Sequence, residues 1–426
     1  YNSLGALDGD NNDNWTIGFY RQLLLTGTAN TSGSTVVRVE VDGAQQNYTY
    51  QSSSGKYRST DGSGAADTVL YNADTGKWTW TDGASGNTET WQWNGALGVR
   101  QLLNQNDASG NSVGYTYNSS ALLSTVTSAN SSGSQKDITE LVYDTTAGKT
   151  GNLLALRTTA WDAATGTNQA LTRVRYRYDS SNRLASVTLD LSPADRSITD
   201  GNTWVTTYTY DGASKRVQTI TEEDGSTLAF TYWASGRIAS MTDAQGGVTR
   251  FDYNNTTNAR TTVTDALGLV TIYDYDSSTR QLSKITAPAV DGVAATRQFS
   301  YDASGNVTRI IDGEGNAVDY QYDAQGNQTL QRDAAGNTIS RTFNPKNQLA
   351  TETVYLVPDP DGAASLQPGS GLTTRHVYDA GGKNQLRFVL SPEGRVTETR
   401  YDSYGQPIST IRYTANLYSL STLAQT

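Results

Sequence analysis

The chain has 426 residues, a net charge of −10, a pI near 4.7 and no cysteine. The acidic balance argues against a nucleic-acid scaffold and against binding to an anionic membrane surface, and the lack of cysteine excludes disulfides, thiolate metal sites and thiol catalysis. A hydrophobic content of 36%, with 26 tyrosines and 40 glycines, is typical of an extracellular all-β protein rather than a compact enzyme, and no apolar run is long enough to span a membrane.

The first 47 residues differ from the rest of the chain. They start at Tyr1 without a signal-like segment, so we expect a fragment or a processed portion of a longer protein. Oxygen-bearing side chains alternate as in a calcium loop at Asp8, Asp10, Asn12 and Asn14. The EF-hand requirement for a later glycine and a bidentate glutamate is not met. A plain polar loop is therefore the simpler interpretation, with a weak calcium site as the alternative.

Residues 48–415 repeat, and residues 416–426 form a tail that has lost the repeat. An aromatic residue, usually tyrosine followed by aspartate, recurs most often every 21 or 22 residues. Polar or proline-bearing insertions at 128–137, 190–201 and 357–371 account for the longest steps. A fixed period of this length indicates a repeat architecture.

The stretch 301–343 shows the repeat most clearly. Asp302, Asp312, Asp323 and Asp333 are each followed three residues later by glycine. Aspartate at the first turn position can accept hydrogen bonds from the backbone, and glycine supplies the positive φ that closes the turn. The intervening segments of five to eight residues are rich in Thr, Val, Ile and Tyr, which favours strands. Each unit is therefore expected to be an antiparallel hairpin.

Two aromatic residues stand at positions i and i+2 just before most turns, as in Tyr208–Tyr210 and Tyr320–Tyr322. In a strand these side chains lie on one face. We expect successive hairpins to stack the rings on one another in a continuous row. The opposite face is expected to be a solvated wall and carries Arg175, Arg177, Asp274 and Gln321.

The tyrosine–aspartate units closely resemble the YD-repeat, or Rhs-repeat, family. The best matches begin at Tyr178, Tyr301, Tyr322 and Tyr401, and the resemblance covers about residues 48 to 415. It implies a spiral strip of β-sheet that forms a hollow shell, open or partial. In polymorphic toxins such a shell encloses a C-terminal toxin, and in teneurin-like and wall-associated proteins it is a surface module. The family's toxin-processing segment, with its catalytic aspartates, has no counterpart before Thr426, so self-cleavage is not inferred.

The residues suggest no catalytic constellation. His376 is the only histidine, and it stands where other units have an aromatic ring, so we interpret it as part of the stack. Neighbouring carboxylates such as Glu222 and Glu223 lie in turns, which explains them without glycosidase chemistry. We therefore expect a non-enzymatic scaffold without a cofactor, with calcium at the N-terminal loop as the alternative named above.

The predicted function is that of a secreted or surface-displayed shell that encloses or displays a cargo such as a toxin or effector domain. One alternative is an adhesin or carbohydrate-binding module that uses its densest aromatic cluster, which consists of Trp78, Trp80, Trp91 and Trp93. Another is a β-strip that assembles with itself through its open sheet edges. The expected partners are therefore a cargo, a cell-surface molecule or further copies of the chain. We expect neither nucleic-acid binding nor a membrane-spanning segment.

Overall fold

The computed structural model describes residues 13–59, 67–83, 85–95, 99–133, 136–149, 151–162, 167–192, 198–254, 259–359, 362, 371–379, 384–402 and 405–423. These residues form thirty-two β-strands and one short 3-10 helix, Leu420–Thr422. The predicted all-β hairpin array is confirmed. No helix within the described ranges is long and apolar enough to cross a membrane.

The strands follow one another along the chain with short connections. The first sixteen are β1 (Gln22–Thr26), β2 (Thr35–Val39), β3 (Gln45–Gln51), β4 (Lys56–Ser59), β5 (Thr68–Asn72), β6 (Lys77–Thr81), β7 (Thr88–Asn94), β8 (Val99–Asn106), β9 (Ser112–Tyr117), β10 (Leu123–Ala129), β11 (Lys136–Tyr143), β12 (Leu153–Asp162), β13 (Thr167–Tyr178), β14 (Leu184–Asp190), β15 (Thr203–Tyr210) and β16 (Val217–Thr221). Strands β1 and β2 precede residue 48, so the sheet begins within the N-terminal 47 residues, which lack the repeat.

The second half has the same construction and ends ten residues before the last described residue. Its strands are β17 (Thr227–Tyr232), β18 (Ile238–Thr242), β19 (Val248–Asn254), β20 (Arg260–Thr264), β21 (Val270–Tyr275), β22 (Leu282–Val290), β23 (Val293–Tyr301), β24 (Val307–Ile311), β25 (Ala317–Tyr322), β26 (Gln328–Arg332), β27 (Thr338–Phe343), β28 (Leu349–Tyr355), β29 (Gly371–Tyr378), β30 (Leu386–Leu390), β31 (Val396–Tyr401) and β32 (Pro407–Tyr413).

Every strand pairs antiparallel with the next one in the chain, so the sheet is a single meander. In an antiparallel meander, alternate connections lie on opposite edges. We call the edge with the even-to-odd connections (β2–β3 to β30–β31) rim A, and the edge with the odd-to-even connections (β1–β2 to β31–β32) rim B. The sheet is an open strip between the two rims.

The turns are made as the sequence predicts. In the β23–β24 turn, Oδ1 of Asp302 accepts hydrogen bonds from the backbone N–H groups of Ser304 and Asn306, each at 2.9 Å. The side-chain amide of Asn306 donates to the other carboxylate oxygen at 2.9 Å, and Gly305 has a φ of +87°. The aspartate thus binds its own turn through both carboxylate oxygens.

The anchor tyrosines join each hairpin to the strand before it. Most odd strands end with a β-bulge against the following strand, as between Ser300 and Tyr301. The tyrosine hydroxyl reaches back to the preceding strand. There it donates to a backbone carbonyl that lies outside the residues paired between the two strands, as Tyr322 on β25 does to Val307 on β24 at 2.8 Å. The same contact recurs in Tyr117–Leu102, Tyr178–Leu153, Tyr210–Leu184, Tyr232–Val217, Tyr301–Leu282, Tyr378–Leu349 and Tyr401–Leu386.

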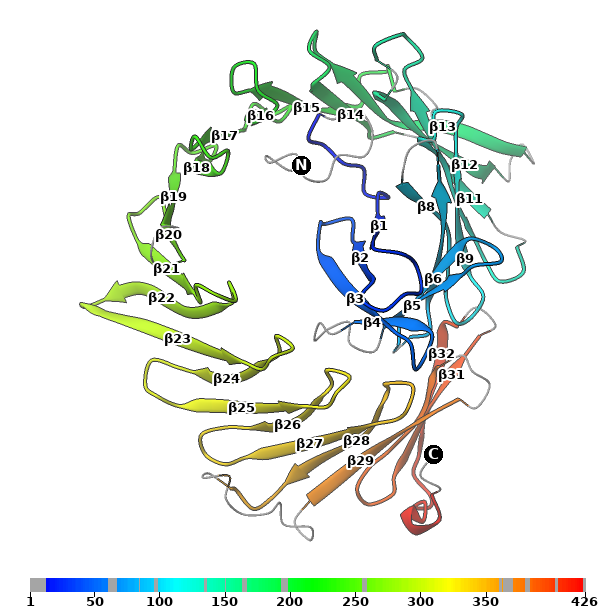
Figure 1. Cartoon of the computed structure of the whole chain (residues 1–426), viewed down its shortest axis with the longest axis vertical. Coiled ribbons are helices and arrows are strands. Elements are labelled where there is room, and N and C mark those ends of the chain that lie inside the picture. Colours follow the sequence, from blue (N-terminus) through cyan, green and yellow to red (C-terminus); the bar gives the residue numbers. More distant parts are fainter. Residues whose placement is uncertain are drawn as a thin grey trace.

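The strip curves into a ring, and the N-terminal strands lie inside the curve (Figure 1). Strand β1 lies against β8, and between them β1 to β8 enclose a core of buried residues. This core consists of Leu23, Val36, Tyr48, Tyr57, Val69, Trp78, Trp80, Trp91 and Leu102. The C-terminal strands β31 and β32 return to the neighbourhood of the first strands (Figure 1). The strip therefore completes about one turn without its sheet closing.

The Tyr322→Phe variant tests the tyrosine–carbonyl contact. Removing the hydroxyl leaves the Val307 carbonyl without its donor, which costs about 1 kcal/mol. We expect hydrogen-exchange protection of β24 and β25 to fall about fivefold, since 1.4 kcal/mol is a factor of 10. Tyr275→Phe is the control, because its hydroxyl has no hydrogen-bond partner among the described residues. Equal losses in the two variants would contradict the role of the hydroxyl.

The acid sensitivity of the turns is a second expectation. The Asn316 side-chain amide, together with backbone N–H groups, holds the pKa of Asp312 below its usual range, and Asn337 does the same for the pKa of Asp333. A lowered pKa in the folded state gives stability that is complete above the unfolded pKa of about 3.9 and is lost as the pH falls through the folded pKa.

Asn at these two positions can accept the same backbone hydrogen bonds but does not titrate. The Asp312→Asn/Asp333→Asn double variant should therefore lose less stability than the unchanged chain between about pH 4 and pH 2. Urea midpoints at pH 7, 4, 3 and 2 measure this. An unchanged dependence on pH would show that the two carboxylates do not contribute.

Candidate functional site

The candidate site is the face of the strip that carries the aromatic pairs. From β15 to β23 an aromatic residue on each odd strand lies opposite an apolar residue on the following even strand, and on β25 Tyr320 lies opposite Gln331. The row consists of Tyr208, Ile220, Phe230, Met241, Phe251, Val263, Tyr273, Ile285, Phe299, Ile310 and Tyr320. We call the face that carries this row the inner face.

The expected ring-on-ring stacking is wrong for this row. Within the part of the chain that the structure describes, ring pairs occur among Tyr50, Tyr57, Tyr71 and Trp78 and between Trp15 and Tyr208. The reason is that each hairpin places an aliphatic strand between two aromatic strands. The rings therefore pack on Ile, Val and Met side chains.

The N-terminal residues 13–20 occupy part of the inner face, inside the curve of the strip (Figure 1). The Trp15 ring meets the Tyr208 ring edge-on, with centroids 4.8 Å apart and planes at 66°. Its indole N–H donates to the Tyr210 hydroxyl at 3.2 Å. Ile17 and Phe19 pack against a buried cluster formed by Leu123, Val126, Leu141 and Leu153. The inner face thus holds an irregular stretch of polypeptide through aromatic and aliphatic side chains.

A cavity of about 300 Å³ remains beneath this segment. It is lined by Ile17 and Phe19 from above and by Leu156, Tyr176 and Val187 of the sheet. Burial raises the pKa values of Tyr176 and Tyr208, so both phenols stay protonated at neutral pH. The site offers apolar surface with neutral hydroxyl groups, and the one carboxylate in its lining, Asp13, accepts a hydrogen bond from the backbone N–H of Trp15.

Beyond this segment the inner face stays accessible among the residues that the structure describes. Among the described apolar side chains from β17 to β29, Ala259 alone is fully buried, whereas those of the inner row are half-buried. Apolar surface left accessible over many strands commonly marks a site of interaction. One stretch of the inner face therefore binds residues 13–20, and a longer stretch with the same kinds of side chain remains accessible.

A buried ion pair fixes the N-terminal strands within the ring. Arg38 on β2 donates to both carboxylate oxygens of Glu89 on β7, at 2.8 and 2.7 Å, and both side chains are almost fully buried. Glu89 also accepts from Arg21 and from Gln105, and the Arg38 guanidinium stacks 3.9 Å from the centroid of Trp80. Burial alone would raise the pKa of Glu89, but hydrogen bonds and the charge of Arg38 outweigh it and lower the pKa.

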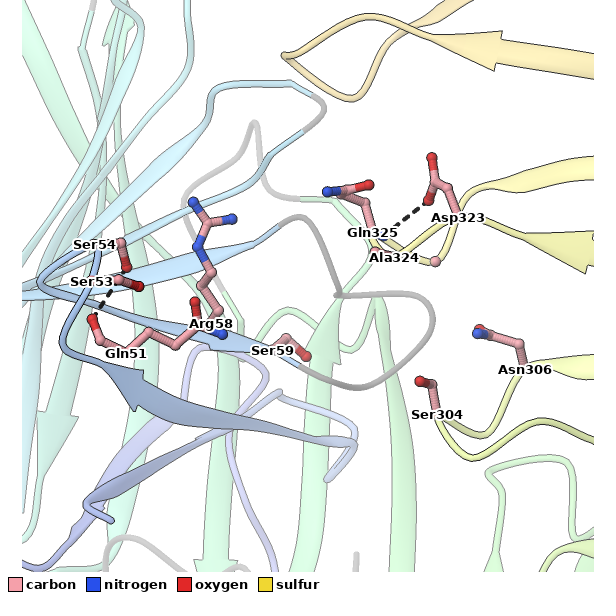
Figure 2. A pocket seen from close by; sticks show the side chains of 11 residues that line it. Gln51, Ser53, Ser54, Arg58, Ser59, Ser304, Asn306, Asp323, Ala324 and Gln325 are labelled. Carbon is pink, nitrogen blue, oxygen red and sulfur yellow. Dashed lines mark hydrogen bonds between the residues drawn. The ribbon is translucent and has the colours of Figure 1, made fainter. Parts of the chain in front are cut away.

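A polar pocket separates the β3–β4 hairpin from the rim B turns of β23–β24 and β25–β26 (Figure 2). Its volume is about 410 Å³, and Arg58 extends into it from β4 opposite Asp323 and Gln325. Both oxygens of Asp323 are already bound within its own turn, at 2.9 Å from each donor. This pocket lies where the N-terminal hairpin approaches the later strands, and its lining contains no aromatic ring.

The two ends of the strip meet at a seam. The Asn384 side-chain amide, in the β29–β30 connection on rim B, donates to the Ser85 carbonyl in the β6–β7 connection on rim A at 3.1 Å. Gly405 of the β31–β32 turn lies so close to Ser109 of the β8–β9 turn that a Cβ atom would clash with its hydroxyl. Rim B of the last hairpins thus rests on rim A of the early ones.

The predicted cation loop is mostly outside the described residues. Asp8, Asp10 and Asn12 are not described, and Asn14 is a left-handed residue with a φ of 72°. Within the described ranges, no group of three or more His, Asp or Glu side chains could hold a metal ion. Calcium binding by the loop stays a prediction.

The predicted tryptophan cluster divides into two parts. Trp78, Trp80 and Trp91 are buried in the core of β1 to β8, whereas Trp93 is 49% exposed. The guanidinium of Arg100 lies 5.1 Å from the centroid of Trp93. A ring that stacks on a sugar must be accessible, so carbohydrate binding stays a prediction that rests on Trp93.

His376 lies on β29 two residues before Tyr378, in the place of the first aromatic of a pair. Burial lowers the pKa of His376, and its Nδ1 has no hydrogen-bond partner among the described residues. This placement agrees with the interpretation of His376 as part of the row.

Two features of the site escaped the sequence analysis. The repeated aromatic pairs predicted a row, but the sequence has no signal that residues 13–20 would lie on it. The Arg38–Glu89 pair joins strands 51 residues apart, and neither residue belongs to a repeated motif. The tyrosine–carbonyl contact could have been expected, since a buried phenol normally has a hydrogen-bond partner.

Comparisons with known proteins identify the repeat. Residues 232–264 and 301–354 match the family model of the RHS repeat, which confirms the resemblance seen in the sequence over these regions. A search of curated protein sequences finds no match.

Several solved structures match most of this chain at low identity and with TM-scores below 0.5. The crystal structure of TcdB2-TccC3 is 13% identical, with a TM-score of 0.42 over 90% of this chain. The crystal structure of TcdB2-TccC3-Cdc42 is 14% identical (TM-score 0.41, 89% of this chain), and the Tc holotoxin pore of Photorhabdus luminescens is 15% identical (0.35, 90%). This chain spans 23–24% of the length of those chains.

The buried ion pair yields a stability prediction. Glu89→Gln removes the buried counter-ion of Arg38 and leaves it only the partly exposed Glu40, which should cost about 3–5 kcal/mol. Glu40→Gln is the matched control, because Glu40 also contacts Arg38 but is partly exposed, and we expect a cost below about 1 kcal/mol. Urea unfolding followed by tryptophan fluorescence measures both. Similar costs for the two variants would contradict the account of the pair.

Proposed function

We propose that this chain, which carries RHS repeats, forms part of a non-catalytic shell whose inner face holds a polypeptide cargo in a non-native, extended state. The observation that carries the proposal is the seating of residues 13–20 on the inner face. Trp15, Ile17 and Phe19 supply the contacts there. A toxin or effector domain is the cargo that the resemblance implies, and action after secretion or at the cell surface belongs to the same proposal.

The chemistry of the inner face suits an unfolded chain better than a folded partner. A folded protein keeps most of its large apolar side chains buried, whereas an unfolded chain exposes aromatic and aliphatic side chains at short intervals. The accessible part of the inner row, from β17 to β25, has the same residue types as the stretch that binds residues 13–20, namely aromatic and aliphatic side chains with tyrosine hydroxyl groups. Burial of one such side chain contributes about 1.5–3 kcal/mol before ordering costs. Several weak contacts along the row can therefore hold a cargo without sequence specificity.

The proposal is tested with a soluble protein that stays unfolded, such as reduced and carboxymethylated α-lactalbumin carrying a fluorescent label. Fluorescence anisotropy measures its binding to the intact chain. We expect saturable binding, weakened at least tenfold in a Phe299→Ser/Tyr320→Ser variant, because both rings lie in the inner row. Folded α-lactalbumin should bind at least tenfold more weakly than the unfolded form.

The matched control is Ser300→Ala/Gln321→Ala, which changes the exposed neighbours on the opposite face of the same strands. This variant should bind the unfolded protein as the unchanged chain does. Equal loss in both variants, or the absence of any binding, would contradict a role for the inner face.

A further inference from the structure

We infer that rim A is an interface for a second copy of this chain, which docks on it head-to-tail through its own rim B. The inference is independent of the cargo and concerns the assembly of strips. It rests on the distribution of exposed apolar residues, on the charges of the two rims and on the seam.

Rim A carries most of the exposed large apolar side chains. The β20–β21 turn presents Leu267, which is 85% exposed, and the β22–β23 hairpin presents Val290 and Val293 at 73% and 74%. The β28–β29 connection adds Leu356 at 63%. On rim B the exposed large apolar side chains among the described residues are isolated from one another, and they are Trp93, Trp233 and Ile408. Apolar hairpin apices gathered along one edge mark that edge as an interface.

The charges of the rims are complementary. The rim A turns from β16–β17 to β26–β27 contain acidic residues and no lysine or arginine, with three consecutive acids at 222–224 and a further pair at Asp312 and Glu314. The rim B turns from β15–β16 to β21–β22 contain four basic and two acidic residues, which are Lys215, Arg216, Arg237, Arg280, Asp211 and Asp276. Charge complementarity of this kind sets orientation and speeds association.

The seam shows this docking mode within one chain. There, rim B turns of β29–β32 rest on rim A turns of β6–β9, through the Asn384–Ser85 hydrogen bond and the close approach of Gly405 to Ser109. Small residues make the approach possible. The free rim B turns after β15 and β17 also present small residues, Ala213 and Ala234, and both are exposed. A second copy can therefore repeat the contact against the apolar apices of rim A.

The association is measured by sedimentation velocity between about 1 and 100 µM. We expect concentration-dependent dimers or longer chains, because a head-to-tail contact does not close by itself. The apparent Kd should rise at least tenfold in Leu267→Asp/Val293→Asp and should also rise in 500 mM NaCl. Leu70→Asp, on β5 and on neither rim, is the control for an exposed leucine and should leave the Kd unchanged.

The orientation is tested by cross-linking, which the absence of native cysteine makes specific. Ala266→Cys places one thiol on rim A, and Ser235→Cys places one on rim B. A short bis-maleimide should join the two variants to each other in preference to joining either with itself. Preferential A-to-A linkage would overturn the head-to-tail arrangement.

A monomer at 100 µM, or a Kd indifferent to the rim A substitutions or to salt, would overturn the inference. A monomer that still binds unfolded α-lactalbumin would refute only this inference, and a dimer that binds none would refute only the proposed function.

Discussion

The structure depends on the link between each hairpin and the strand before it. An isolated hairpin is marginal in water, so each unit is stable only through its neighbours. Ladder hydrogen bonds join the strands, and the anchor tyrosine adds to this link by donating to a carbonyl outside the residues paired between its own strand and the preceding one, as Tyr322 does to Val307. Because the anchor tyrosine stands two residues after a member of the inner row, as Tyr322 does after Tyr320, it lies on the same face of the strand and contributes both to the spacing of the hairpins and to the chemistry of the inner face.

This arrangement gives the strip three separate surfaces. The inner face is apolar and aromatic, the outer face carries pairs such as Thr231–Ser240 and Arg260–Asp274, and the rims carry the turns. Aspartates are abundant in the turns, but their oxygens bind backbone N–H groups of the same turn. Function is therefore expected from shape and apolar contact, which agrees with a shell better than with an active site.

The sequence predicts what repeats and fails where a feature occurs once. The Asp302 and Asp312 turns, the hairpin period and the face shared by Tyr320 and Tyr322 follow from local rules, and all are present. The sequence could not show that aliphatic strands would separate the rings, since the residues between turns were read mainly as strand formers. It also could not place Trp15 against Tyr208 or pair Arg38 with Glu89, because such contacts depend on the curvature of the whole strip.

The central claim is that the inner face, rather than the outer one, touches polypeptide. Neighbouring positions on β25 offer the most direct test, because Tyr320 lies on the inner face and Gln321 on the outer. A photoreactive benzoylphenylalanine placed at one position or the other reports contact with labelled unfolded α-lactalbumin. The account predicts cross-links from position 320 and few from position 321. Equal yields, or cross-links mainly from position 321, would contradict it.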